Sequence, residues 1–292
     1  MNILTFDIEE WALDKAKGTG SPKRNAEYDT FLNRILDVLD NRSIKATFFC
    51  TGMMAADFPQ VVKLIQSRGH EIGCHSFRHT WMNKMTEDEA REDTHSAVDA
   101  LEQCIGEKMR SYRAPAFSIG ESNKWMFEIL AENGIECDAS IFPAARAFGG
   151  FANFGKKEPC IIEYNGLKLK EFPICTTRLL GKEMAYSGGG YFRLFPFWFV
   201  KNRIVSSDYN MCYFHIDDLT PEKQPIKSKD EYEGYYKESG TLINRYLRYF
   251  KANIGKKSAF VNMASLIQCT DFISLGQAEK MIEWEKPVTV AL

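Results

Sequence analysis

Two histidines separated by three residues are the strongest chemical signal in the sequence. His75 and His79 lie in the segment HSFRH, and a helical turn would direct both imidazoles towards a single metal ion. A carboxylate from another strand would complete a two-histidine, one-carboxylate site with open positions for water and substrate. The acidic stretch 7–10 offers three candidates, and extended geometry puts Asp7 and Glu9 on the same side of the chain.

Polar residues also stand where several apolar runs end. Asp7 follows the run ILTF, Arg113 ends the run before it, and His215 follows MCYF. In parallel β/α proteins the reactive groups project from the carboxyl ends of the strands into the loops that follow. One such residue alone more often caps or satisfies a neighbouring polar group. The shared placement of these three residues with His75 is what predicts a site.

Short β-like runs alternate with longer helix-like runs along the chain. The predicted strands cover residues 2–7, 45–51, 71–75, 110–113, 135–139, 168–174, 211–215 and 258–263. The predicted helices cover residues 28–41, 58–68, 86–105, 121–134, 193–206 and 230–252. This alternation is typical of parallel β/α units. Because no GxGxxG motif follows a strand, we predict an α/β fold with a closed or nearly closed barrel of about seven strands.

One segment departs from the alternation. Two strand-like runs flank Asn165 and Gly166 between residues 161 and 169, and an Asn-Gly pair in this position is the usual sign of a type I′ hairpin. We expect this hairpin to be a small addition to the barrel. No repeat or low-complexity tract marks a boundary, so residues 1–292 are predicted to form a single domain.

Composition limits the classes of partner. Thirty-seven basic and 39 acidic residues give a formal net charge of −2, which does not favour nucleic acid as a partner. The densest apolar run, 194–200, is interrupted by Pro196 and is much shorter than the roughly 20 residues of a membrane span, so no transmembrane segment is predicted. The first residues lack the features of a signal peptide, which predicts a cytoplasmic location.

Five short motifs follow one another in a familiar order. They are TFD ending at Asp7, HSFRH, RAP beginning at Arg113, DAS beginning at Asp138 and YFH ending at His215. In this order they resemble the polysaccharide deacetylases of carbohydrate esterase family 4, and the resemblance runs from residue 3 to about residue 267. It implies a distorted β/α barrel that binds a divalent metal, commonly zinc.

The resemblance implies a role for each matched residue. His75 and His79 resemble the histidine ligands of the metal. Asp7 resembles the general base that takes a proton from the attacking water, and His215 resembles the general acid. The acid is needed because an amine leaves poorly unless it is protonated.

Three further roles are implied by the same resemblance. Arg113 would hold Asp7 ionised, because a neighbouring cation favours the charged carboxylate. Asp138 would orient and charge the acid His215. The backbone N–H of Ala116, the residue after the proline of the RAP motif, would help to bind the oxyanion.

The sequence also differs from many family members. Where those have two adjacent aspartates, this chain reads DIEE, so the carboxylate ligand is predicted to be Glu9, with Glu10 as the alternative. Ala116 stands where many relatives have tyrosine, which removes a side chain that would shape the sugar pocket. We therefore expect a substrate specificity that differs from theirs.

A glycine-rich segment, SGGGYFRLFP, resembles that of a subgroup associated with exopolysaccharide assembly. Its glycines would let the backbone approach a ligand closely, and the aromatic residues after them could stack on a sugar. Gly189, Gly190, Tyr191 and Arg193 are therefore candidate substrate-binding residues. The competing interpretation is a plain loop followed by a buried helix.

The leading functional prediction is a metal-dependent hydrolase that removes the acetyl group from an N-acetylhexosamine. Its substrate would be a polysaccharide, an oligosaccharide or a lipid-linked glycan precursor, and a lipid-linked substrate would bring transient contact with a membrane surface. One alternative is a small-molecule amidohydrolase, because the same barrel resembles proteins that open cyclic ureides. The other is a glycan-binding relative that has lost turnover.

Overall fold

The computed structural model describes residues 1–9, 26–146, 149–179, 181–236 and 238–292. Its main sheet has the strand order β10-β1-β2-β3-β4-β5-β7-β6-β11, and the first seven strands of this order are parallel. These seven are β10 (Asn210–His215), β1 (Asn2–Ile8), β2 (Thr47–Cys50), β3 (Glu71–Cys74), β4 (Ser111–Tyr112), β5 (Cys137–Asp138) and β7 (Leu167–Glu171). Seven of the eight predicted strands are confirmed.

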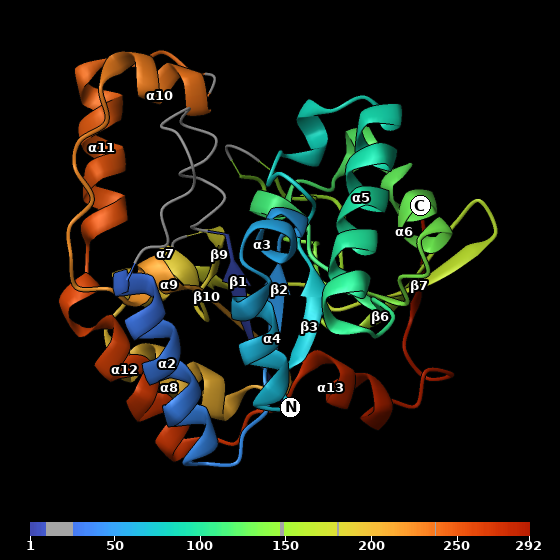
Figure 1. Cartoon of the computed structure of the whole chain (residues 1–292), viewed down its shortest axis with the longest axis horizontal. Coiled ribbons are helices and arrows are strands. Elements are labelled where there is room, and N and C mark those ends of the chain that lie inside the picture. Colours follow the sequence, from blue (N-terminus) through green and yellow to red (C-terminus); the bar gives the residue numbers. More distant parts are fainter. Residues whose placement is uncertain (10–25, 147–148, 180, 237) are drawn as a thin grey trace.

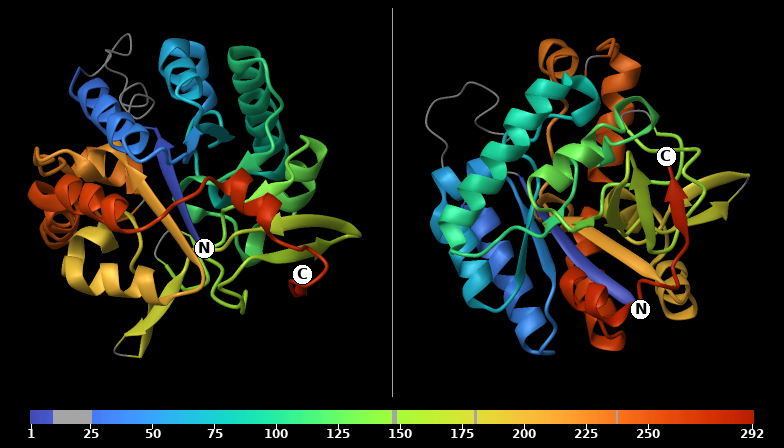
Figure 2. Two further views of the ribbon diagram at one scale, coloured as in Figure 1. Left: turned by 90° about the horizontal axis from the view of Figure 1, so that it is seen from below. Right: turned by 90° about the vertical axis from the view of Figure 1, so that its right-hand side faces the viewer.

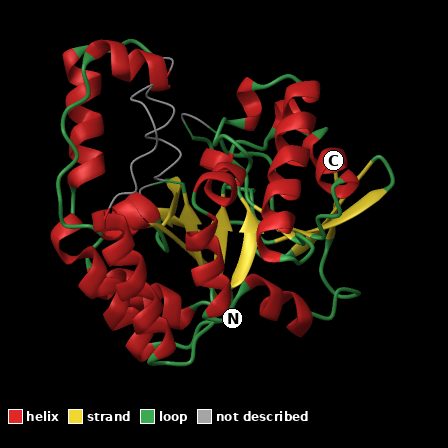
Figure 3. Ribbon diagram, in the orientation of Figure 1, coloured by secondary structure: helices red, strands yellow, loops and turns green. Residues whose placement is uncertain are grey.

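Helices surround this sheet (Figure 2), and they lie on its outer side (Figure 3). Because a parallel sheet is covered by its crossover helices, its strands are apolar runs rather than alternating ones. In β1, every residue from Ile3 to Ile8 is buried. The helices between the strands are α2 (Ala26–Asp40), α3 (Gly52–Asp57), α4 (Pro59–Ser67), α5 (Glu87–Ile105), α6 (Met126–Glu132), α7 (Gly189–Leu194) and α8 (Phe197–Ser206). After β10 come α9 (Ile216–Leu219), α10 (Lys229–Tyr236), α11 (Leu242–Asn253), α12 (Lys256–Cys269) and α13 (Leu275–Met281).

The sheet curls into a barrel, and Arg113 demonstrates the curvature. This residue directly follows β4, which lies three places from β1 and would be about 14 Å away in a flat sheet. Its guanidinium nevertheless reaches Thr5 and Asp7 of β1 at 2.7 and 2.8 Å, and Met211 of β10 at 3.3 Å. The predicted distorted barrel of about seven strands is confirmed.

The predicted hairpin is present as β6 (Cys160–Tyr164) and β7, which pair in antiparallel fashion. Asn165 and Gly166 both have positive φ, at 49° and 81°, as a type I′ turn requires. The hairpin is more than an addition, because β7 is itself the last parallel strand and pairs with β5. Beyond β6 the sheet is extended by β11 (Thr289–Ala291). A separate hairpin joins β8 (Thr176–Leu179) to β9 (Lys182–Ala185).

Three predicted elements differ from the structure. The strand predicted at 258–263 is wrong, since these residues lie in α12, where Ala259, Met263 and Leu266 are buried at helical spacing. The helix predicted at 230–252 is two helices, because Thr241 starts a new one by accepting a hydrogen bond from the Asn244 N–H. The helix predicted at 193–206 is likewise two, α7 and α8, with Pro196 at the junction.

Candidate metal and catalytic centre

Glu9, His75 and His79 come together at the carboxyl ends of β1 and β3. Their nearest ligand atoms all lie within 4.8 Å of one another, and all three residues are buried. His75 Nε2 lies 3.3 Å from Glu9 Oε2, and His79 Nε2 contacts the same oxygen. Although burial raises the pKa of Glu9, the facing His79, His215 and His75 hold it well below its usual value, so the carboxylate stays charged. Glu10, the alternative ligand, lies outside the described residues.

This cluster suits a divalent metal. In a tetrahedral zinc site the bonds of about 2.0–2.2 Å place neighbouring ligand atoms about 3.3 Å apart, which matches the separation of 3.3 Å between His75 and Glu9. The Arg113 carbonyl accepts a hydrogen bond from His75 Nδ1 at 2.7 Å, which leaves Nε2 without a proton and facing the site. Two histidines and one carboxylate would leave a position open for water and substrate.

The two histidines meet through a tight turn, so the predicted helical turn is wrong. Ser76 and His79 have φ of 60° and 57°, in the left-handed region that non-glycine residues seldom adopt. The turn is held by Asp93 on α5, whose carboxylate accepts hydrogen bonds from the N–H groups of Phe77 at 2.8 Å and Arg78 at 3.3 Å. Strain of this kind persists where the surroundings fix the backbone, and it is common at functional sites.

Asp7 lies beside the metal cluster and is held by Arg113. The Arg113 guanidinium is fully buried, donates to Asp7 Oδ1 at 2.8 Å and packs over the Phe49 ring at 4.3 Å. Asp7 is paired in register with His215 on the adjacent strand β10, and its Oδ2 lies 3.8 Å from His215 Nε2. The predicted base, its arginine and the predicted acid therefore lie together at one end of the barrel.

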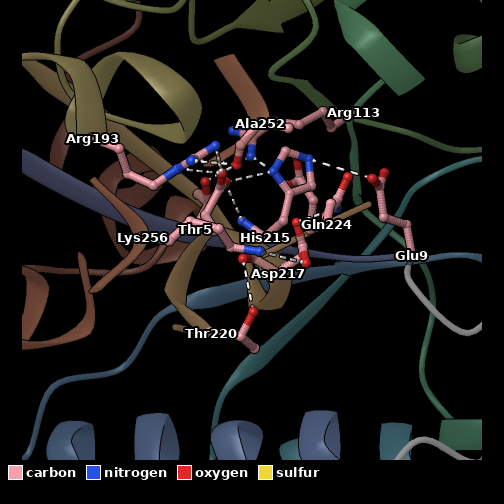
Figure 4. A network of polar contacts seen from close by, with 12 residues as sticks. Thr5, Glu9, Arg113, Arg193, His215, Asp217, Thr220, Gln224, Ala252 and Lys256 are labelled. Atoms are coloured by element: carbon pink, nitrogen blue, oxygen red, sulfur yellow. Dashed lines mark hydrogen bonds and ion pairs between the residues drawn. The ribbon is translucent and has the colours of Figure 1, made fainter. Parts of the chain in front are cut away.

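His215 is oriented by Asp218. Its Nδ1 lies 2.8 Å from Asp218 Oδ2, while its Nε2 lies 3.6 Å from Glu9 Oε1, as Figure 4 shows for the Glu9 side of the ring. Although burial lowers the pKa of His215, the carboxylates of Glu9, Asp218 and Asp7 raise it well above its usual value. The site thus favours a protonated imidazole that can donate from Nε2.

The prediction that Asp138 orients His215 is wrong. The Nδ1 atom of His215 faces Asp218 at 2.8 Å, and among the described residues Asp138 makes no contact with the ring of His215. Its carboxylate instead accepts a hydrogen bond from Ser140 Oγ, which in turn accepts one from the Ala114 N–H at 2.8 Å. Asp138 therefore supports the turn that follows Arg113.

That turn carries Ala116, which has a left-handed φ of 53° like the next residue, Phe117. Within the part of the chain that the structure describes, the Ala116 N–H makes no hydrogen bond to the backbone or to a side chain. A left-handed residue with a free N–H is compatible with the predicted oxyanion donor, and this role stays a prediction.

The glycine-rich segment packs against β10. A Cβ atom on Gly188 would lie 2.1 Å from the Tyr213 carbonyl oxygen, and Gly189, with φ of 53°, is buried against the same tyrosine. The close approach that needs these glycines is thus to the barrel itself, which corrects the interpretation of Gly189 as a substrate contact. Gly190 is exposed and Tyr191 is half-buried, and their predicted role in binding substrate stays a prediction.

Arg193 is a partner of Asp218 and not a substrate-binding residue. Its Nε and Nη2 lie 3.1 and 2.9 Å from Asp218 Oδ1, and its Nη1 donates to the carbonyls of Ala252 and Ile254 at 2.7 and 2.9 Å (Figure 4). With these contacts filled, the guanidinium has no free edge for a sugar. Although burial raises the pKa of Asp218, His215 and Arg193 hold it well below its usual value.

Two carboxylates of the site, those of Asp218 and Asp93, were not identified from the sequence. Asp218 lies three residues after His215, a spacing that lets a carboxylate at the start of a helix cap the chain and reach the preceding ring. Asp93 lies on the buried side of α5 among Ala90, Ala97 and Val98. An acidic residue within an apolar stripe is the signal that could have identified it.

Comparison with known proteins gives two family matches that together cover most of the chain. Residues 3–137 match the family model for polysaccharide deacetylase, and residues 139–276 match a second model, a domain of unknown function (DUF3473). The class defined by fold and family match is a β/α barrel of the deacetylase kind, with Glu9, His75 and His79 as a candidate metal site. Residues 3–137 thus match the polysaccharide deacetylases of carbohydrate esterase family 4, the family that the motifs resemble.

Individual relatives cover a smaller part. A peptidoglycan-N-acetylglucosamine deacetylase of Bacillus cereus is 37% identical over 99 residues, which are 34% of this chain and 36% of the relative. The peptidoglycan-N-acetylmuramic acid deacetylase PdaA of Bacillus subtilis is 32% identical over 104 residues, 33% of this chain and 40% of that protein. The chain thus spans little more than a third of the length of these curated relatives.

The fold is matched along almost the whole chain. The crystal structure of a putative polysaccharide deacetylase from Mycobacterium smegmatis covers 99% of this chain, with 92% of its own length aligned, a TM-score of 0.65 and 18% identity. At this identity the likeness establishes the fold alone.

Proposed function

We propose that the protein is a metal-dependent N-deacetylase that hydrolyses the acetamide of an N-acetylhexosamine in a polysaccharide, oligosaccharide or lipid-linked glycan precursor. The observation that carries the proposal is the convergence of a three-residue ligand set, a carboxylate base and a histidine acid. His215 Nε2 lies 3.8 Å from Asp7 and 3.6 Å from Glu9. The names of the curated relatives support the reaction class.

Each residue has a defined task in this proposal. Glu9, His75 and His79 would hold the ion, which we propose to be zinc. When bound, such an ion lowers the pKa of water and polarises the acetamide carbonyl. Asp7 accepts a proton from the attacking water, and Arg113 holds that carboxylate in position by donating to its Oδ1 at 2.8 Å.

The second proton transfer belongs to His215. As the C–N bond breaks, Nε2 gives its proton to the amine, so that water and the acetamide become acetate and a free amino sugar. Asp218 stabilises the imidazolium before the transfer through the 2.8 Å contact with Nδ1. The Ala116 N–H would stabilise the negative oxygen of the tetrahedral carbon.

An aromatic pair at the rim supports a glycan over a small amide. Trp81 follows His79 by two residues, and its ring meets that of Tyr235 on α10 at 6.2 Å and 86°. Tyr235 is 40% exposed, and an exposed ring at the edge of a polar site is suited to pack on the apolar face of a sugar. We propose that these two rings contact a sugar next to the acetylated one.

The first test combines elemental analysis of the purified protein with acetate release from chitooligosaccharides and other glycans containing N-acetylglucosamine, before and after chelation. Bound zinc with acetate release that chelation abolishes would support the proposal. Bound metal without acetate release from any glycan would point to another amide or to a binding role. Absence of metal after reconstitution would contradict the mechanism.

The Asp7→Asn variant tests the chemistry directly. The amide keeps the shape of the carboxylate but cannot accept the proton, so acetate release should fall by about 10²- to 10⁴-fold while the metal stays bound. Asp271→Asn is the matched control, since that carboxylate is 99% exposed and far from the site. Full activity of Asp7→Asn would reject its assignment as the base.

The cytoplasmic location expected from the sequence would favour a biosynthetic precursor as the natural substrate. The likeness of the glycine-rich segment to an exopolysaccharide subgroup would make that precursor one of a cell-envelope glycan. The cytoplasmic precursor and its place in a cell-envelope glycan are both proposals, and they can be tested once the sugar has been identified. Acetate release from lipid-linked and free forms of the same oligosaccharide would compare them.

A further inference from the structure

Helix α11 has an apolar surface that the described residues of the chain leave exposed. Leu242, Ile243, Tyr246, Leu247 and Phe250 are each between 53% and 73% exposed, and none of the 12 residues of the helix is buried. Their spacing of one, three and four residues places all five on one side of the helix. A contiguous apolar patch of this kind on a folded protein marks an interaction site.

The helix is turned the opposite way from an ordinary surface helix. Its polar side faces α10 and the residues just before it: Arg248 packs over the Tyr236 ring at 4.6 Å, and Arg245 donates to the Lys227 carbonyl at 3.2 Å. A surface helix normally directs its apolar stripe to the core and its charges to water. In α11 the polar side is bound to the protein, so the apolar side is the one presented outward.

The position of the helix is equally unusual. With α10 it forms an arm that stands at the edge of the molecule, on the side to which the carboxyl ends of β1 and β3 point (Figure 1). The arm belongs to the site, since Tyr235 of α10 contacts Trp81. Among the described helices, none has the length and apolar character needed to cross a bilayer.

The charge of the segment identifies the surface that would cover it. Residues 242–270 contain five basic and no acidic side chains, although the whole chain has a net charge of −2. Three of the five contact the protein itself: Arg245 at the Lys227 carbonyl, Arg248 at Glu238 and Lys256 at Asp217. Lys251 and Lys257 are exposed. Apolar side chains on one face of a helix, together with Lys and Arg, are the features of helices that lie in the headgroup region of a membrane.

We propose that α11 docks on the surface of an anionic lipid membrane, with the five apolar side chains inserted at the level of the headgroups. This goes beyond the proposed deacetylation. Its consequence, that the site works on a glycan held at the membrane, rests on the proposed function, whereas the docking itself does not. A second copy of the chain is a poorer occupant, because a symmetric contact would bring the two acid-free, basic segments together.

The test is sedimentation of the full-length protein with vesicles of phosphatidylcholine alone and with vesicles that also contain phosphatidylglycerol. We expect binding to the anionic vesicles that weakens as salt is added. Ile243→Gln with Leu247→Gln should lower the binding constant about tenfold or more, since the apolar contact is lost while the helix is retained. Lys251→Gln should lower it about fivefold on anionic vesicles.

The matched control is Met281→Gln with Val288→Gln, two side chains that are 65% and 53% exposed elsewhere on the surface. This control should bind vesicles as the unmodified protein does. Circular dichroism of each variant verifies that the helices are retained. The Asp7→Asn variant should also bind normally, so that a failure of the proposed chemistry is distinguished from a failure of docking.

Three outcomes would overturn the proposal. The first is absence of binding to anionic vesicles, and the second is equal binding by the Ile243→Gln, Leu247→Gln variant and its control. The third is a dimer in sedimentation velocity that this double variant abolishes, which would identify α11 as a contact between copies. Vesicle binding that is lost only in the α11 variants would support docking.

Discussion

The metal side and the acid side of the centre are built in different ways. Glu9, His75 and His79 all come from the segment 3–137, and local features position them: two strand ends and one strained turn held by Asp93. His215 and Asp218 come from the segment 139–276. The acid is positioned by a chain of charges that ends in Arg193 and the backbone of residues 252 and 254.

The difference shows how the two functions can be separated. A metal ligand set depends on the distances between three atoms, which the parallel strands β1 and β3 provide together with the turn that follows β3. A proton donor depends also on its charge, which distant groups must stabilise in a buried place. Damage to the metal side should therefore remove the ion, whereas damage to the acid side should leave the ion and slow the reaction.

The largest effect is expected for His79→Ala. The variant lacks one of three proposed ligands, so it should lose the metal on dialysis and release no acetate above background. Elemental analysis together with the acetate assay measures both. His95→Ala is the control, because the His95 side chain is 68% exposed on α5. Retention of the metal in the His79 variant would show that the ligand set is wrong.

The next effect is expected for Asp218→Asn. The amide cannot stabilise the protonated His215, so kcat should fall roughly a hundredfold while the metal content is unchanged. Asp271→Asn is the control, because that carboxylate is 99% exposed. A loss of metal in Asp218→Asn would contradict the separation of the two sides.

A smaller effect is expected for Asp93→Ala, and it should change metal affinity instead of kcat. Without its carboxylate the turn between His75 and His79 loses two hydrogen bonds, so metal affinity should fall about 10- to 100-fold. With metal in excess, kcat should stay near that of the unmodified protein. Competition with a chromogenic chelator measures the affinity. Asp99→Ala, at an exposed position of the same helix, is the control, and an equal loss of affinity there would refute the role of Asp93.

The smallest effect concerns the stability of the fold. It arises at Asp138 and Glu171, which belong neither to the metal ligands nor to the pair of His215 and Asp218. Burial raises the pKa of Asp138 to about 6, and burial with the nearby Asp138 charge raises that of Glu171 well above its usual value. The folded protein thus holds protons that the unfolded chain releases. The stability from this pair is fully present below about pH 4 and is lost as the pH rises through about 6, by about 1–3 kcal/mol.

Glu171→Gln tests this pair. The amide can donate to the Asp138 carboxylate at any pH, so the loss of unfolding free energy between about pH 4 and 7 should be smaller than in the unmodified protein. Urea unfolding of both proteins in chelator, which removes the pH dependence of metal binding, gives the difference. Glu163→Gln on β6 is the control, and parallel curves for all three proteins would contradict the shared proton.

Much of the barrel could be predicted from the sequence, because each strand is marked by a short apolar run and the polar residue that ends it. The apolar runs that end in Asp7, His75, Arg113 and His215 identify both the strands and the end of the barrel where chemistry occurs. The strand predicted at 258–263 failed because short apolar runs fit strand and helix alike. The longer burial pattern of α12, which decides the matter, extends well beyond that window.

Which residues reach the candidate site was predictable from the strand ends and the order of the motifs, but some of their partners were not. Asp138 was assigned to His215 from the resemblance of its motif to the family, but in the structure His215 contacts Asp218, and Asp138 contacts Ser140. Arg193 was assigned to substrate because a cation after a glycine-rich loop resembles a ligand contact. Its actual partners, residue 218 and the backbone near 252, are 25 and 59 residues away in sequence, and no periodicity relates positions so distant.

The fork of Arg193 has a consequence for modularity. One guanidinium joins the carboxyl end of α11 to Asp218, and through it to the ring of His215. The arm therefore cannot be exchanged or deleted on its own. Its removal would take the carbonyl acceptors of residues 252 and 254 from the buried Arg193 and so disturb the proton donor His215. A chimera that borrows the arm from another barrel must bring along a backbone that presents the same two carbonyls, or replace the arginine together with its carboxylate.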